Sequence, residues 1–115
     1  MSFRDLEVWR RSLNLSVSIY RNLSSLTDFG FKGQITRSSL SIPSNIAEGY
    51  GRESNKDLIR FLYIAKGSCS ELETQIIIGM KVEFIHPKLA DRWLKEAEEL
   101  SAMLGGLIQT RKTYN

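Results

Sequence analysis

The side chains best able to do chemistry lie in two stretches of this chain, residues 34–48 and 68–75. Glu48 and Glu71 stand one in each stretch, and two carboxylates held close together are the usual pair for general acid–base catalysis. Catalysis of that kind also needs a pocket, and the sequence predicts none. The polar residues of both stretches recur at steps of three and four, which places them on one face of a helix. We therefore favour a structural interpretation, a polar seam between two packed helices.

The polar seam predicts particular contacts across a helical hairpin that turns near residue 52. Its central contact would be an ion pair between Arg37 and Glu71, braced by Gln34 and Ser68. A buried polar group without a partner costs roughly 1–3 kcal/mol, so these contacts would fix the register of the two helices. The seam comprises Gln34, Arg37, Ser38, Ser41 (expected to face Ile64), Asn45, Glu48, Ser68, Glu71 and Gln75. Asn45 and Glu48, the members nearest the turn, would meet Arg52, Lys56 or Arg60, or a neighbouring subunit.

Other catalytic or metal-binding candidates are weaker. His86, the single histidine, precedes Pro87 at an expected helix start, where a capping or exposed role fits best. Cys69 lies on an apolar helix stripe and is expected to act as a small hydrophobic residue. The chain has no Glu-x-x-His pair for a di-metal site and no glycine-rich phosphate loop. We expect no enzymatic activity, no metal and no cofactor.

Four amphipathic segments account for nearly all of the 115 residues, at about 5–23, 31–50, 54–81 and 87–110. Short connections between long helices make neighbours antiparallel, so residues 1–115 are expected to form one all-α, up-down four-helix bundle. The third segment carries the clearest apolar stripe, Leu58, Phe61, Leu62, Ala65, Cys69, Leu72, Ile76 and Gly79. The stripe expected on the first is Leu6, Trp9, Leu13, Val17 and Tyr20, widened by Val8, Leu15 and Ile19.

Pro43 lies within the second segment, where proline removes a backbone hydrogen bond to the Ser39 carbonyl and costs about 3 kcal/mol. Ser41 could cap a new short helix that starts at the proline. The unbroken spacing from Phe31 to Glu48 instead favours one helix that continues through a kink. In that case serine hydroxyls or water would serve the freed carbonyl.

The third segment has more apolar surface than one bundle needs. Ile59, Tyr63, Ile77 and Ile78 lie off its main stripe. One alternative is a core that is unusually wide at this helix. We favour a subunit interface, because large exposed apolar patches are rare on monomers. The sequence therefore predicts a homo-oligomer.

The net charge of +3 is modest, and the position of the basic residues is more informative. Arg52, Lys56 and Arg60 are spaced four apart and share one helix face, which could be a solvated surface or a phosphate-binding row. Arg10 and Arg11 could add to such a surface. A single cysteine and the absence of a signal peptide or membrane-span pattern favour a cytoplasmic protein with no membrane partner.

Several motifs resemble those of one known family. Leu6-Glu-Val-Trp9, Gln34-Ile-Thr-Arg37, Ser41-Ile-Pro-Ser-Asn-Ile-Ala-Glu-Gly49 and Gly67-Ser-Cys-Ser-Glu71-Leu-Glu-Thr-Gln75 are similar to the signature of the bacterial four-helix-bundle proteins, also called 23S ribosomal RNA intervening-sequence proteins. The resemblance implies a homopentamer with a central channel and no established enzymatic activity. A related branch, the accessory variability protein of diversity-generating retroelements, is a basic pentamer that binds a reverse transcriptase and nucleic acid. This chain is less basic than that branch.

Two functions follow as expectations. The first is binding of nucleic acid, most readily RNA, through basic rows that self-association would multiply. The second is a protein-interaction scaffold, or an accessory subunit, that binds a protein partner without touching nucleic acid. Salt separates them, because phosphate contacts weaken steeply as the salt concentration rises.

Overall fold

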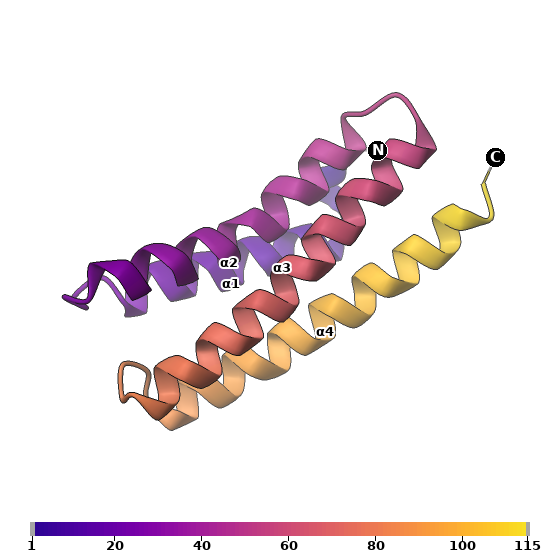
Figure 1. The fold of residues 1–115 in the computed structure, drawn as a ribbon. Coiled ribbons are helices and arrows are strands. Elements are labelled where there is room, and N and C mark those ends of the chain that lie inside the picture. Colours follow the sequence, from indigo (N-terminus) through magenta and orange to yellow (C-terminus); the bar gives the residue numbers. More distant parts are fainter. Residues whose placement is uncertain (1, 115) are drawn as a thin grey trace.

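The computed structural model describes residues 2–114, which form a short 3-10 helix, η1, and four long α-helices (Figure 1). The elements are η1 (Phe3–Asp5), α1 (Glu7–Asn22), α2 (Phe29–Tyr50), α3 (Asn55–Lys81) and α4 (Pro87–Lys112). Successive helices are antiparallel, and the bundle measures 47 × 21 × 19 Å. Helix α2 packs against α1 and α3, α4 packs against α3, and a smaller contact joins α4 to α1. This confirms the all-α four-helix bundle.

Side-chain caps set the helix starts. Asp28 Oδ1 accepts a hydrogen bond from the Phe31 N–H at 3.0 Å, so α2 begins at Phe29, slightly before the expected start near residue 31. Ser54 Oγ accepts from the Asp57 N–H at 3.1 Å at the start of α3. His86 Nδ1 accepts from the Lys88 N–H at 3.1 Å at the start of α4, which confirms its role as a cap.

A left-handed residue ends α3 and not α2. Glycine after a helix is typical of a left-handed cap, but Gly51 at the end of α2 has φ −88° and is right-handed. Among residues 2–114 the positive φ belongs to Glu83, at 66°, just after α3. There the Phe84 N–H donates to the Gly79 carbonyl at 2.8 Å, the hydrogen bond of a Schellman C-cap.

Glu83→Gly is expected to raise the free energy of unfolding by about 1 kcal/mol, because a Cβ in the left-handed region costs roughly 1–2 kcal/mol. Chemical denaturation at a fixed chain concentration measures the change. Glu83→Ala is the control, since it removes the charge and keeps the Cβ. An equal gain from both variants would assign the effect to the carboxylate instead.

The core confirms the stripe expected on α3, all of whose residues are buried, and α2 contributes Ile35, Ile42 and Ile46 to it. The expectation for α1 was wrong in part. The buried face is made by Val8, Leu15 and Ile19 with Ser12 and Ser16, while Leu13, Val17 and Tyr20 are 38–45% exposed. Serine lets α1 approach α2 closely, and Ser16 Oγ lies 2.9 Å from Ser39 Oγ. Hydrophobicity alone therefore selected the wrong face of α1.

Helix α2 runs without a break through Pro43, as the spacing predicted. The hydroxyls of Ser38, Ser39 and Ser41 each donate to the carbonyl three residues earlier, at 2.8–3.1 Å. None of these acceptors is the Ser39 carbonyl that Pro43 frees, so the expected rescue by a serine does not occur. Pro43 itself is buried beside α1.

Candidate nucleic-acid interface

The predicted basic row lies where α2 turns into α3. The guanidinium carbons of Arg52 and Arg60 lie 4.8 and 4.5 Å from the centre of the Phe61 ring. Arg52 also pairs with Glu48 at 3.1 Å, and Arg60 pairs with Asp57 at 3.5 Å. Both pairs are exposed, so they contribute less than about 1 kcal/mol and exchange readily for phosphate. Lys56 is exposed between the two arginines in sequence.

The antiparallel fold brings the end of α4 to the same end of the bundle. Arg111 lies over the rings of Tyr50 and Tyr114, at 5.5 and 4.7 Å. Its carbonyl accepts a hydrogen bond from Asn55 Nδ2 at 2.8 Å, which ties α4 to the start of α3. Lys112 Nζ lies 5.4 Å from the ring of a further aromatic residue, Tyr63.

We call this surface the basic end and define it by Arg52, Lys56, Arg60, Arg111 and Lys112 with the rings of Tyr50 and Tyr114. The Phe61 ring is buried beneath Arg52 and Arg60 and is not part of the surface. Its cations outnumber the neighbouring carboxylates, Glu48, Glu53 and Asp57. A cleft of about 610 Å³ there is lined by residues of both α3 and α4, among them Lys56 and Lys112. Cations beside aromatic faces suit the phosphates and bases of a single-stranded nucleic acid.

Sequence reasoning missed the α4 half of the basic end because the fourth helix had been expected to end near residue 110. The signal was available, since in an antiparallel hairpin the end of α4 must lie near the start of α3.

Arg10 and Arg11 have different environments although they are neighbours. Arg11 bonds to Glu96 through both Nε and Nη2, to Glu99 at 2.7 Å and to Glu7 at 3.3 Å. These carboxylates raise the pKa of Arg11 above its usual range. Arg11 therefore joins α1 to α4 and is not free to bind phosphate, whereas Arg10 is exposed and donates to the Arg4 carbonyl.

Arg11→Ala is expected to lower the free energy of unfolding by about 2 kcal/mol. The Arg11 and Glu96 side chains are each 27% exposed, which places their pair between surface pairs worth below 1 kcal/mol and buried ones worth 3–5 kcal/mol. Arg10→Ala is the matched control and should change stability by less than about 0.5 kcal/mol. Urea denaturation compares the two variants. Equal effects would contradict the structural role given to Arg11.

The polar seam between α2 and α3 exists, but its contacts differ from those expected. Ser41 Oγ lies 2.6 Å from Ser68 Oγ rather than facing Ile64, and Ser38 bonds to Gln75. Among the ion pairs of residues 2–114 there is none between Arg37 and Glu71. These two residues, Gln34 and Gln75 instead line an open cleft of about 260 Å³. Asn45 donates to the Ser41 carbonyl within its own helix.

The register error has a geometric cause. Side chains on a helix lean toward its N-terminus, so in an antiparallel pair their tips shift in opposite directions along the shared axis. Counting outward from the turn therefore pairs each α2 residue with an α3 residue that comes too early in the sequence. Ser41 accordingly contacts a residue one turn further along α3.

The candidates for catalysis are not brought together. Glu48 pairs with Arg52 at the turn, as expected, and is not among the residues that line the cleft with Glu71. Cys69 is buried, and desolvation raises the pKa of its thiol to about 12, so the thiol is protonated at neutral pH. Within residues 2–114 no group of three or more His, Cys, Asp or Glu side chains could hold a metal ion.

The four apolar interface candidates on α3 separate into two kinds. Tyr63, Ile77 and Ile78 are exposed, whereas Ile59 is half-buried against the core. Ile64, which had been expected to meet the seam, is exposed with them. Among residues 2–114, no helix combines the length and the apolarity that crossing a bilayer requires.

Fold and surface together define an antiparallel four-helix-bundle protein with a basic, aromatic end. The chain belongs to the family of 23S rRNA-intervening sequence proteins, whose model matches residues 4–106. A similar crystal structure is that of a protein of unknown function from the S23 ribosomal protein family of Bacteroides thetaiotaomicron VPI-5482. That protein is 28% identical, with a TM-score of 0.82, over 88% of this chain and 97% of its own. No curated protein matches the chain. The family is thereby established, and it is one of unknown function.

Proposed function

We propose that this protein is a non-enzymatic homo-oligomer, pentameric by its family resemblance, that binds single-stranded RNA through the basic end. The observation that supports this most is the meeting of Arg52, Lys56 and Arg60 from α3 and its turn with Arg111 and Lys112 from α4. Cation and ring lie together there, and base stacking and phosphate contact both need that arrangement.

An exposed apolar surface on α3 supports the self-association in this proposal. Tyr63, Ile77 and Ile78 leave an apolar surface on α3 that a single bundle does not cover. A ring of five chains with net charge +3 would carry about +15 and present five basic ends to one strand. Weak sites repeated in this way bind tightly when the strand can reach several of them.

The test is binding of a labelled single-stranded RNA to the purified protein, followed by gel mobility or fluorescence anisotropy at 50 and 200 mM monovalent salt. Three phosphate contacts on one chain predict an affinity loss of roughly 20-fold between these salt concentrations. Duplex DNA of equal length is the competitor that tests the preference for RNA. No RNA binding at 50 mM salt, together with a protein partner retained from the host at high salt, would favour a scaffold instead.

A further inference from the structure

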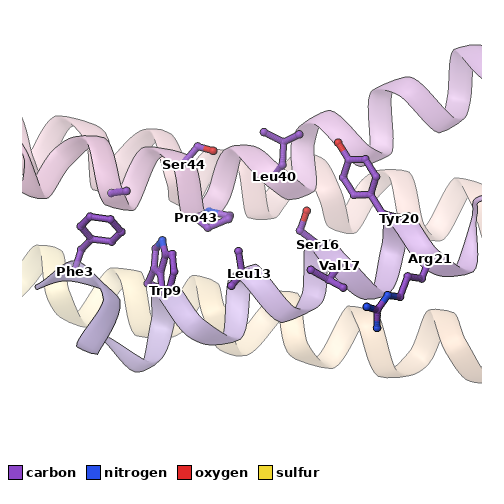
Figure 2. Close-up of a pocket in the computed structure, with 11 residues that line it drawn as sticks. Phe3, Trp9, Leu13, Ser16, Val17, Tyr20, Arg21, Leu40, Pro43 and Ser44 are labelled. Carbon is purple, nitrogen blue, oxygen red and sulfur yellow. The ribbon is translucent and has the colours of Figure 1, made fainter.

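A groove between α1 and α2 is lined almost entirely by apolar side chains. Its volume is about 610 Å³, and its walls are Leu13, Val17 and Tyr20 on α1 facing Leu40 and Pro43 on α2 (Figure 2). Phe3 and Trp9 lie at one end of the groove and Arg21 lies at the other. The α1 side chains recur at steps of three and four, the spacing of a surface that receives a helix.

A second apolar surface follows the outer side of α3. Tyr63 and Ile64 lie at one end, and Ile77 and Ile78 lie at the other, all 39–47% exposed. Gly67 lies between them, and no atom lies within 4 Å of the place where its Cβ would be, so the surface of α3 is open there. We call this surface the α3 ridge.

We infer that the α3 ridge of one chain lies in the α1–α2 groove of the next chain. This inference rests on the proposed self-association and specifies its contact. The occupant of the groove is a second copy because the chain itself carries a complementary helix surface. The contact is heterologous, so each chain gives one surface and receives the other.

Geometry favours this pairing over groove against groove. In a two-fold contact the groove of one chain would pack against the groove of the other. The α3 ridges of both chains would then stay exposed to water. A heterologous contact repeated around a ring covers both apolar surfaces of every chain. The ridge is long enough to fill the groove, since the groove from Trp9 to Tyr20 is roughly 17 Å long and the ridge from Tyr63 to Ile78 is roughly 22 Å.

The charges of the two surfaces are also complementary. Arg21 is the charged residue in the groove lining, and Glu71 is exposed on α3 between Ile64 and Ile78. Neither takes part in an ion pair among residues 2–114. A neighbouring chain would supply each with a partner of opposite sign.

The test is complementation between two variants with matched sites, Val17→Arg in the groove and Ile77→Arg on the ridge. The two side chains are 38% and 39% exposed, so neither variant disturbs the core, and circular dichroism checks the fold. Each variant alone should be a monomer by sedimentation. The equimolar mixture should form dimers, because the intact ridge of the first variant fits the intact groove of the second.

Three results would overturn the inference. If Ile77→Arg alone keeps the wild-type mass, the ridge is not part of the contact. If both variants are monomeric and the mixture stays monomeric, the two surfaces do not meet each other. If the wild-type protein sediments as one 13.1 kDa chain, the proposed self-association fails first and this contact fails with it.

A second measurement uses thiol cross-linking. The double variant Val17→Cys/Ile77→Cys should give a ladder of covalent multimers with a short bismaleimide, while each single variant stays as single chains. Cys69 adds no background because it is buried. Covalent dimers from Val17→Cys alone would show a groove-to-groove contact and contradict the inference, even with the oligomer intact.

Discussion

Replacing Arg52, Lys56 and Arg60 together by glutamate is expected to lower the affinity for single-stranded RNA at least about 500-fold at 50 mM salt. Each phosphate contact with a single strand contributes a salt slope of about 0.7, so three contacts raise the affinity by roughly this factor at 50 mM salt relative to 1 M salt. Reversal of sign adds repulsion beyond it. Fluorescence anisotropy with a labelled RNA measures the change, and the salt dependence should also become shallower.

The matched control reverses Lys88, Arg92 and Lys95 at the start of α4, at the other end of the bundle from the basic end. These side chains are exposed, and Lys95 pairs with Asp91 much as Arg60 pairs with Asp57. The net charge changes equally in both triple variants. An equal loss of affinity in the control would mean that total charge, and not the basic end, attracts the RNA.

Gly79→Leu is expected to lower the free energy of unfolding by about 3 kcal/mol. A Cβ at this position would lie 2.5 Å from Ile85 Cδ1 and 2.8 Å from Phe31 Cζ. The start of α2 and the connection into α4 meet α3 here, and the Phe31 and Phe84 rings pack edge to face at 5.3 Å. Overpacking a filled core typically costs 1–3 kcal/mol, and leucine adds four carbon atoms. Guanidinium unfolding at one fixed chain concentration measures the change.

Gly106→Leu is the control for Gly79→Leu. It makes the same substitution inside α4, where no atom lies within 4 Å of the Cβ position. Leucine is a better helix former than glycine by roughly 0.8 kcal/mol, so this variant should be slightly more stable than the wild type. Similar destabilisation by both substitutions would mean that the close contact at Gly79 is not the cause.

Much of the fold could be predicted because it depends on local patterns. The observed helices lie within about two residues of the expected ones, since caps such as Asp28, Ser54 and His86 act within one turn. The buried stripe of α3 was also predictable. Its apolar residues follow one continuous face of the helix, even though further apolar residues lie beside that face. On α1 the same reasoning failed, since that helix has two apolar faces and serines make the closer contact.

The candidate site divides in the same way. The row from Arg52 to Arg60 is a periodicity within one helix, and so the sequence reveals it directly. Arg111 and Lys112 join it only because α4 ends beside the start of α3. Arg11 was a candidate for phosphate binding because of its charge alone. In the structure it bonds to carboxylates of α4 and is not free to bind phosphate.

The sequence by itself determined the helices, the antiparallel bundle and the positions of the charges along each helix, because these follow from interactions over a few residues. Tertiary structure decided which apolar face of α1 is buried, which seam residues touch, and which basic residues gather at one end. These outcomes depend on how closely two surfaces approach and on the direction in which side chains lean. Both are set by neighbouring helices, and they put Leu13, Val17 and Tyr20 on the wall of an open groove.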